Sequence, residues 1–488
     1  MPEDAPSRRN AEPEGLDPPH DVRTRLAALL LADLEQHHDG VGDLPVAPSI
    51  NRTDLRSRVG SIDLEVPGES EAVLAAALSL LADATVHTNS PRYFGLFNPT
   101  PTFAGVLAEA AVAAYNPQLA VWSHAPAAVE IERRLIDYIG ARAGYRSGRV
   151  AGSFTTGGAE ANLTAVLLAL TRAFPTYAEH GVRSLPGQPT LYASTESHLA
   201  WLKIAHACGL GRDAVRLIPH DSDLQLDPAR LEARVLADRA AGDLPFLAIA
   251  TVGTTGCGAI DPVGSLADAC EAQELCLHVD AAWAGALVLS DRLRPLLGDL
   301  HRADSLTIDA HKWLSVPMGA GMFICEDAGG LAETFRVETS YMPSRETGDP
   351  YLQSIQWSRR AIGFKLFLSL AMIGRTGYAV QLEHDVALGA ALRERLREAG
   401  WQIVNDTPLP LVCFTHPVLS GVSADAAHEW LAAEIVRRGR AWVSTARVRG
   451  EIALRACITS HRTTVDDLET LVDELGQSLG AVRAAKGV

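Results

Sequence analysis

The chain has 488 residues, of which 47% are hydrophobic and 21% charged, and its formal net charge is -16 with histidine neutral. This mix is typical of a globular protein with a large core. The negative charge argues against polyanionic partners, namely DNA, RNA and anionic membrane surfaces. The seven cysteines form no CxxC pair or Cys/His ladder, so we expect reduced thiols in a cytoplasmic protein and no metal site.

The first part of the chain is predicted to hold a leader followed by helices. Residues 1–20 are rich in Pro, Glu, Asp and Arg and lack the apolar stretch of a signal peptide, so we expect a disordered leader. Residues 21–85 show helical periodicity in "VRTRLAALLLADLEQHH" and "SEAVLAAALSLLADAT", with a proline-containing link between them. Such helices cannot bury both faces alone, which predicts a dimerisation segment. No apolar run is long enough to span a bilayer.

Residues 86–375 alternate between apolar runs and helix-like stretches. The runs "TLYAS", "AVRLIP", "PFLAIATV", "LCLHVDAA", "SLTIDA" and "GMFICED" are separated by helical patterns such as "GGAEANLTAVLLALTRAF" and "DPARLEARVLADRAAG". This alternation predicts a large α/β domain with a mostly parallel sheet covered by helices on both faces.

The pattern changes after residue 375. A long helix, "YAVQLEHDVALGAALRERLREAG", precedes four short strand-like runs and a final helix, "TVDDLETLVDELGQSLGAVRAA". Residues 376–488 are therefore predicted to form a small α+β domain.

The first chemical motif is "TTGGAEAN", where a turn opens into a helix. Gly157 and Gly158 let the backbone approach an anion, and the start of the helix supplies free N–H groups. The motif has neither the Lys-Ser/Thr of a Walker loop nor the GxGxxG of a dinucleotide site. It is also compatible with an ordinary capped helix.

Two further motifs follow apolar strands. In "HVDAAWAG", Asp280 could cap a loop, bind a metal together with His278, or hold a proton on a nitrogen heterocycle. In "DAHKW", Lys312 could be a surface lysine or a desolvated amine that forms a Schiff base. The carboxyl ends of parallel strands meet at one edge of a sheet, so the three motifs are expected to lie together. A phosphate cradle, a carboxylate and an amine are what pyridoxal 5'-phosphate (PLP) requires.

With "HVDAAWAG" and "DAHKWLSVPMGAG" at this spacing, the chain resembles the group II PLP-dependent decarboxylases, the family of aromatic-amino-acid, histidine and glutamate decarboxylases. The resemblance covers residues 86 to about 465. It implies a large domain of PLP fold type I, which is aspartate-aminotransferase-like, and a homodimer whose active sites lie between the subunits.

The resemblance also implies roles for individual residues. Lys312 matches the lysine that holds the cofactor as a Schiff base, and Asp280 matches the partner of the pyridine nitrogen. His198 matches the histidine stacked on the pyridine ring, with a helix-start residue without ligand as the alternative. The other matched cofactor contacts are Gly157, Gly158 and Ala159 in the phosphate loop, Asp309 near the phosphate, His311, Ala282 against the ring, and Thr255.

The stretch "VETSYMPSRETGDPYLQS" resembles the mobile catalytic loop of the family. Tyr341 matches the tyrosine that protonates the substrate α-carbon after CO2 leaves, and Tyr351 is the competing candidate. Relatives with Phe at that place tend towards oxidative aldehyde formation, so Tyr341 favours simple decarboxylation.

The segment "SPRYFGLFNPTPTFAG" resembles the side-chain pocket of the aromatic-amino-acid decarboxylases, where Phe97 matches an aromatic wall. Asn98 and Gln118 are more polar than their counterparts there. We expect decarboxylation of an aromatic L-amino acid (Trp, Tyr or Phe). The alternatives are a polar or acidic L-amino acid, oxidative deamination to an aldehyde, transamination, and a non-catalytic protein with this fold.

Overall fold

The computed structural model describes residues 16–337, 339–340, 348–421 and 424–486. The chain separates into two compact units, Met1–His87 and Thr88–Val488. Among the described residues, no helix combines the length and the apolar character that crossing a bilayer requires.

The first unit is helical, with α1 (His20–Gly40), α2 (Arg52–Gly60) and α3 (Ser70–Ala84). Helices α1 and α3 pack against each other, and an ion pair joins Arg25 to Glu71 at 2.5 Å. The sequence indicated α1 and α3 but missed α2, which begins after Asn51. The Asn51 side chain accepts hydrogen bonds from the second and third backbone amides that follow it, a cap that stabilises the helix start. None of the three helices contains a buried residue.

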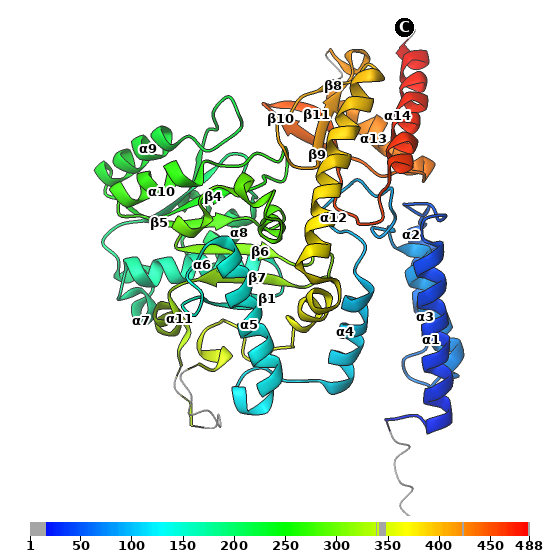
Figure 1. The fold of residues 1–488 in the computed structure, drawn as a ribbon, viewed down its shortest axis with the longest axis horizontal. Coiled ribbons are helices and arrows are strands. Elements are labelled where there is room, and N and C mark those ends of the chain that lie inside the picture. Colours follow the sequence, from blue (N-terminus) through cyan, green and yellow to red (C-terminus); the bar gives the residue numbers. More distant parts are fainter. Residues whose placement is uncertain (1–15, 338, 341–347, 422–423, 487–488) are drawn as a thin grey trace, which may run out of the picture. The chain divides into compact units, whose positions relative to one another are not determined.

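The second unit is built on a seven-stranded sheet with the order β1-β7-β6-β5-β4-β2-β3 (Figure 1). Its strands are β1 (Ala151–Thr155), β2 (Pro189–Ser194), β3 (Val215–Ile218), β4 (Leu244–Thr251), β5 (Cys276–Asp280), β6 (Ser305–Asp309) and β7 (Gly321–Cys325). Neighbouring strands are parallel except β7, which runs antiparallel to β1 and β6. The predicted α/β class with a mostly parallel sheet is confirmed.

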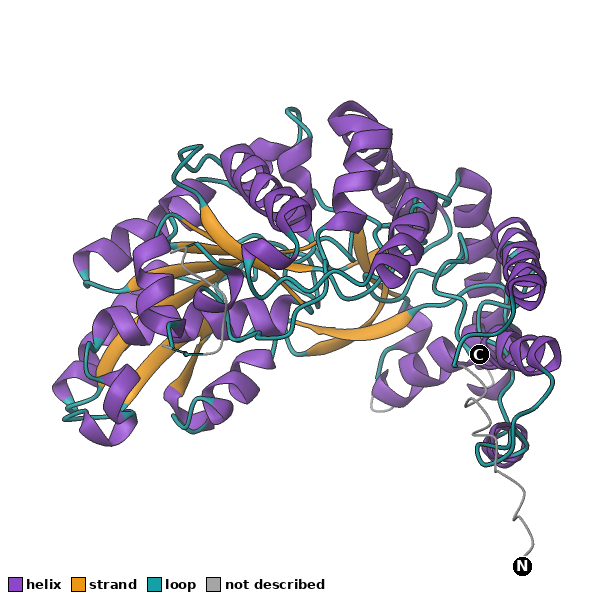
Figure 2. Ribbon diagram, turned by 90° about the horizontal axis from the view of Figure 1, so that it is seen from below, coloured by secondary structure: helices purple, strands orange, loops and turns teal. Residues whose placement is uncertain are grey.

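Helices lie on both sides of these strands (Figure 2). The crossovers from β1 to β2 and from β2 to β3 run one way across the sheet, and those from β3 to β4 and from β4 to β5 run the other way. Because parallel crossovers are right-handed, α6 and α8 lie on one face and α9 and α10 on the other. The α-helices of this region are α4 (Phe103–Tyr115), α5 (Pro126–Ala143), α6 (Gly158–Ala173), α7 (Tyr177–His180), α8 (Ala200–Ala207), α9 (Pro228–Ala240), α10 (Val263–Ala272) and α11 (Ala328–Phe335).

Short 3-10 helices complete the connections. They are η1 (Trp122–His124), η2 (Val182–Ser184), η3 (Arg212–Ala214), η4 (Ala284–Leu289), η5 (Arg294–Leu297), η6 (Leu300–Arg302), η7 (Pro350–Leu352) and η8 (Pro417–Leu419).

Strand β1 is absent from the strands predicted by sequence, because its residues read as a turn before the glycine motif. The glycine in the middle of this strand, Gly152, is required by its packing. Its φ is +152°, and a Cβ atom there would lie 2.0 Å from the carbonyl oxygen of Phe323 on β7. Close approach of two backbones therefore requires glycine in the middle of this strand.

A second, four-stranded sheet has the order β10-β11-β9-β8 and is antiparallel. It consists of β8 (Gln402–Ile403), β9 (Leu411–Thr415), β10 (Ser444–Val448) and β11 (Glu451–Cys457), accompanied by α12 (Phe364–Glu398), α13 (Ala424–Arg438) and α14 (Val465–Lys486). Helix α12 begins earlier than predicted and is interrupted at Gly374, where φ is +73° and ψ is 160°. Helix α13 was missed because its buried face is formed largely by small residues and a histidine rather than by large apolar side chains. The division at residue 376 stays a prediction.

We expect Gly152→Ala to lower the free energy of unfolding by roughly 2 kcal/mol, since the new methyl group overpacks the contact with β7. The thermal unfolding midpoint measured by calorimetry checks this. Gly476→Ala on α14 is the control, because no heavy atom lies within 4 Å of its added Cβ. An unfolding midpoint for Gly152→Ala at or above that of the control would contradict the argument.

Candidate active site

The carboxyl ends of the parallel strands gather most of the residues predicted to contact a cofactor. The glycine turn follows β1, His198 follows β2, Thr255 follows β4, Ala282 follows β5, and His311 and Lys312 follow β6. Asp280 and Asp309 are the last residues of β5 and β6. This edge is where ligands bind in open α/β sheets.

Asp280 is buried, with 6% of its surface exposed. Its Oδ2 accepts a hydrogen bond from Nδ2 of Asn162 at 2.9 Å, and its Oδ1 accepts one from the amide of Ala282 at 3.1 Å. Across the described residues, no Lys, Arg or His forms an ion pair with this carboxyl group. A buried carboxylate with neutral donors alone is well suited to a cationic ligand.

Behind Asp280, a second set of hydrogen bonds orients Asn162. The Asn162 Oδ1 atom lies 3.2 Å from Nε2 of His278, and Nδ1 of His278 lies 2.8 Å from Oγ of Ser305. Burial lowers the pKa of His278 to about 4, so the imidazole is neutral near pH 7. His278 is thus part of the hydrogen-bond network rather than a metal ligand. No group of three or more metal-ligating side chains occurs in the part of the chain that the structure describes.

Lys312 has its Nζ atom 3.1 Å from Oδ2 of Asp309. Asp309 is 2% exposed, and its Oδ1 atom is buried with no hydrogen-bond partner. His311 accepts a hydrogen bond at Nδ1 from the amide of Ala320 at 3.2 Å, and burial lowers the pKa of its imidazole. The three polar residues of "DAHKW" therefore form one cluster, with an acceptor atom left unsatisfied.

The glycine turn lies against the same cluster. Gly157 precedes α6, and Gly158 and Ala159 are its first two residues. A Cβ atom on Gly158 would lie 2.9 Å from Oδ2 of Asp309, and one on Gly157 would lie 3.5 Å from His311. The Glu160 side chain accepts hydrogen bonds from both the amide and the hydroxyl of Thr156, which fixes the turn. The start of α6 thus presents backbone amides beside Lys312 in a space that only glycine leaves open.

Aromatic rings form a wall beside Lys312. Phe97 stacks on Trp283 with ring centroids 4.4 Å apart, and Trp283 lies 5.3 Å from Trp313. The Lys312 Nζ atom lies 6.0 Å from the centroid of the Phe97 ring. Phe97, predicted to be an aromatic wall of the substrate pocket, therefore lies near Lys312, and its contact with a substrate stays a prediction.

Arg455 on β11 was missed by sequence reasoning. It is 2% exposed, and its guanidinium carbon lies 4.9 Å from the Phe97 ring centroid. It donates hydrogen bonds to the carbonyl oxygens of Gly95 at 2.6 Å and Thr255 at 2.9 Å, whereas its Nη2 atom is buried without a partner. The available signal was a lone arginine in the apolar run "EIALRACIT". A buried cation with an unpaired donor against the Phe97 ring can bind an anionic group.

The remaining predicted residues differ in their surroundings. His198 is exposed and accepts a hydrogen bond from the amide of Ala200. The Asn98 side chain donates to the sulfur of Met318 at 2.9 Å, and Gln118 Oε1 accepts from the amide of Ala120 at 2.6 Å. Their place in the substrate pocket stays a prediction. Tyr341 lies outside the described residues.

Tyr351, the competing candidate for Tyr341, is buried and packs against Trp357 with ring centroids 5.2 Å apart. Its backbone amide donates to the carbonyl oxygen of Ala120. These contacts are those of a packing residue.

Comparison with known proteins gives matches over most of the chain. The model of the pyridoxal-dependent decarboxylase conserved domain matches residues 58–416. The chain is 27% identical over 441 residues to the aromatic-L-amino-acid decarboxylase of Bacillus atrophaeus, with 88% of this chain and 90% of that protein covered. It is 30% identical over 367 residues to the cysteine sulfinic acid decarboxylase of Mus musculus, with 72% of each chain covered. A crystal structure of mouse CSAD has a TM-score of 0.87 and 25% identity, covering 93% of this chain and 98% of that one.

The fold and these matches define a PLP enzyme of fold type I. The chain belongs to the pyridoxal-dependent decarboxylase family and is a PLP-dependent carboxy-lyase that acts on an amino acid. The family, the enzyme class and the cofactor predicted from the sequence are confirmed.

The described residues fit this cofactor. Asp280 is a buried carboxyl group without a cationic partner among the described residues, the glycine turn offers amides to a phosphate, and the Lys312 amine lies beside Asp309. Gly321 on β7 packs tightly against the same turn, since a Cβ atom there would lie 2.4 Å from Oγ1 of Thr155.

We predict that the free energy of unfolding falls as pH decreases from about 6.5 to about 4, because unfolded His278 takes up a proton that the folded imidazole excludes. The loss is on the order of 3 kcal/mol for this residue. Urea unfolding at several pH values, compared between the wild type and the non-titrating His278→Gln, measures it. Equal pH dependence in the two proteins would show that His278 is not buried in its neutral form.

Proposed function

We propose that the protein decarboxylates an aromatic L-amino acid, namely Trp, Tyr or Phe, to the amine and CO2. The observation that carries the proposal is the stack of Phe97 on Trp283, in which the Phe97 ring centroid lies 6.0 Å from the Lys312 amine, so that an apolar aromatic wall adjoins the candidate active site. The similarity to the aromatic-L-amino-acid decarboxylase of Bacillus atrophaeus supports it.

Bound PLP supplies an aldehyde that reacts with amines and a protonated ring that accepts the electron pair released with CO2. In this proposal Lys312 holds the cofactor through its Nζ atom, and the amides of Gly158 and Ala159 bind the phosphate. His198 and Ala282 would contact the ring, and Thr255, His311 and Asp309 would complete the binding site.

Asp280 is proposed to hold a proton on the pyridine nitrogen. Asn162 and the amide of Ala282 each occupy one carboxylate oxygen, so the carboxyl group keeps one orientation and retains lone pairs for that proton. Because the residues around it are neutral, no competing cation reduces its attraction for the pyridinium.

The substrate loses its carboxylate as CO2, and one proton replaces it on Cα. Tyr341 is proposed as the donor of that proton, as the sequence predicts. The substrate is held by Phe97 on its side chain and by Arg455, whose free Nη2 donor fits a carboxylate oxygen.

Arg455 also favours a second candidate function, the decarboxylation of an acidic L-amino acid. A carboxylate on the substrate side chain would satisfy the same buried guanidinium. The similarity to cysteine sulfinic acid decarboxylase supports this alternative.

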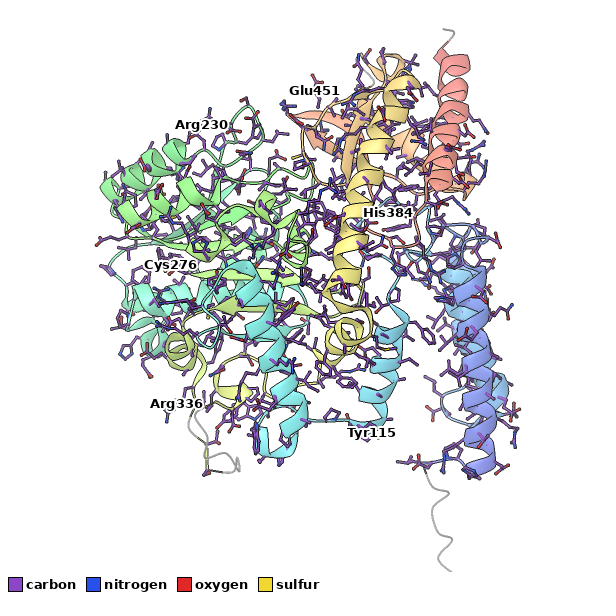
Figure 3. The ribbon with its side chains drawn as sticks, viewed as in Figure 1. Tyr115, Arg230, Cys276, Arg336, His384 and Glu451 are labelled. Carbon is purple, nitrogen blue, oxygen red and sulfur yellow. The ribbon has the colours of Figure 1, made fainter. Side chains whose placement is uncertain are left out.

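We further propose that the enzyme is a cytoplasmic homodimer. The three helices of the first unit bury none of their residues, although they carry apolar side chains such as Leu31 and Leu81. Helix α4 likewise exposes Phe103, Leu107 and Tyr115, the last of which projects from the end of the helix (Figure 3). Such surfaces favour burial in a second subunit. Seven free cysteines support a reducing compartment.

A panel of L-amino acids tests the substrate. We expect CO2 and the amine, detected by mass spectrometry, from Trp, Tyr or Phe, and no activity in Lys312→Ala, which also loses the near-visible absorbance of the bound cofactor. Turnover of acidic amino acids alone would favour the second candidate. An aldehyde with hydrogen peroxide would indicate oxidative deamination, and no CO2 from either class would contradict the proposal.

Replacing Arg455 with Met is expected to lower kcat/KM by roughly 30-fold or more, since a buried charged hydrogen bond contributes about 2 kcal/mol or more. Steady-state kinetics and the unfolding midpoint are measured together. Arg447→Met is the matched control, because that arginine is exposed and pairs with Asp425 on the surface. An unchanged kcat/KM in the folded Arg455→Met variant would exclude the carboxylate-binding role.

A further inference from the structure

Asp385 is a second buried carboxyl group that the mechanism above does not use. It lies on α12, next to His384, which Figure 3 labels, and it is 0% exposed. Its Oδ2 accepts a hydrogen bond from Nε1 of Trp313 at 2.8 Å, and its Oδ1 accepts one from Nε2 of Gln381 at 2.8 Å. Within the described ranges, no basic side chain forms an ion pair with it. Burial of a carboxyl group without a cation is costly, so its presence calls for an explanation.

Trp313 connects this carboxyl group to the candidate active site. It follows Lys312 directly in the chain and is 2% exposed. Its ring contacts Trp283 at 5.3 Å between centroids, and Trp283 stacks on Phe97 at 4.4 Å. The three rings therefore form a continuous contact from Asp385 to the ring that lies 6.0 Å from the Lys312 amine.

A hydrogen bond from its indole nitrogen holds each of the two tryptophans in this series of rings. Nε1 of Trp283 donates to the carbonyl oxygen of Gly253 at 2.6 Å, and a Cβ atom on Gly253 would lie 2.8 Å from the same indole nitrogen. Trp313 has a hydrogen bond from its indole nitrogen to Asp385. Loss of that bond would leave a buried N–H unsatisfied and free the indole to turn in its pocket.

A neutral acceptor such as an amide would satisfy the indole N–H of Trp313 equally well. Burial of a carboxyl group costs more free energy than burial of an amide. Burial raises the pKa of Asp385 to about 7, so its ionised form is disfavoured up to neutral pH. In either protonation state, a carboxyl oxygen of Asp385 accepts from the indole N–H and holds it in a defined direction.

We propose that Asp385 is a positioning residue for the decarboxylase: its carboxyl group fixes the indole of Trp313, and through Trp283 it fixes the Phe97 ring against the substrate side chain. The inference rests on the proposed role of Phe97 as the wall of the substrate pocket.

Three variants test it. Asp385→Leu removes the acceptor at similar volume, Trp313→Phe removes the donor and keeps a ring, and Asp385→Asn keeps an acceptor oxygen. We expect Asp385→Leu and Trp313→Phe to raise KM for the aromatic substrate about 5-fold to 10-fold with kcat changed less than 2-fold. The double variant should be no worse than either single variant, because both remove one interaction. Asp385→Asn should retain a KM within about 2-fold of the wild type.

The near-ultraviolet circular dichroism of the stacked indoles gives a readout that needs no substrate. It should weaken in Asp385→Leu and persist in Asp385→Asn. Glu474→Gln on α14 is the control for a buried carboxylate outside the site, where it pairs with Arg438 and Arg440. This control should lower the unfolding midpoint and leave both KM and the dichroism unchanged.

Additive effects of Asp385→Leu and Trp313→Phe, or lower stability with unchanged KM and dichroism, would overturn the proposal. If Asp385→Leu does not fold, KM and dichroism are compared between Trp313→Phe, which lacks the hydrogen bond, and Asp385→Asn, which keeps it. Failure of the proposed function would look different from failure of this inference. The wild type would not turn over aromatic amino acids, yet its dichroism would still change when Asp385 is replaced.

Discussion

Asp280 is a buried carboxyl group that has only neutral partners among the described residues, and the proposed chemistry depends on it. At the end of β5, Asp280 is held by the amide of Ala282 and by Asn162, and Asn162 is in turn oriented by a neutral histidine. An ionised carboxyl group in such surroundings is stabilised when a cation binds next to it. The pyridinium ring of PLP is a cation of the right kind, and the rest of the site lies around the place that it would take.

The sheet explains how distant parts of the chain reach this place. The glycine turn, Asp280 and Lys312 follow or end β1, β5 and β6, which run in the same direction with β7 antiparallel between β1 and β6, so their carboxyl ends lie at one edge. Close packing requires glycine at this edge, since Cβ atoms on Gly158 and Gly321 would collide with Asp309 and Thr155. The Lys312 amine has Asp309 as its partner in this arrangement. The Arg455 guanidinium lies against the aromatic rings, 4.9 Å from the centroid of Phe97.

Much of this arrangement could be predicted from the sequence, because the motifs are local. A strand that ends in Asp280, a strand that ends before Lys312 and a glycine turn before a helix each leave a pattern within a few residues. The alternation of strands and helices then places them at one edge. The mostly parallel sheet follows from the same alternation, whereas the order of the strands, with β7 antiparallel between β1 and β6, was not predicted.

Residues whose role depends on contacts with distant parts of the chain have no such local pattern in the sequence. Asn162 is one polar residue on the buried face of a helix, and Arg455 is one arginine in an apolar strand that belongs to the other sheet. Asp385 lies on a helix more than seventy residues after the tryptophan that it binds. Strand β1 escaped prediction because Gly152 is required there by the backbone of β7. The hydrogen bonds of Asn98 to Met318 and of Ala120 to Gln118 likewise could not be predicted, because the side-chain geometry leaves no pattern in the sequence.

The central claim is that Asp280 keeps the ring nitrogen of bound PLP protonated. Nitrogen-15 NMR of the enzyme loaded with PLP labelled at the ring nitrogen tests it most directly, with Asp280→Asn as the comparison. The account predicts a protonated nitrogen in the wild type at neutral pH and an unprotonated one in the variant. An unprotonated nitrogen in the wild type, or the same protonated signal in both proteins, would contradict it.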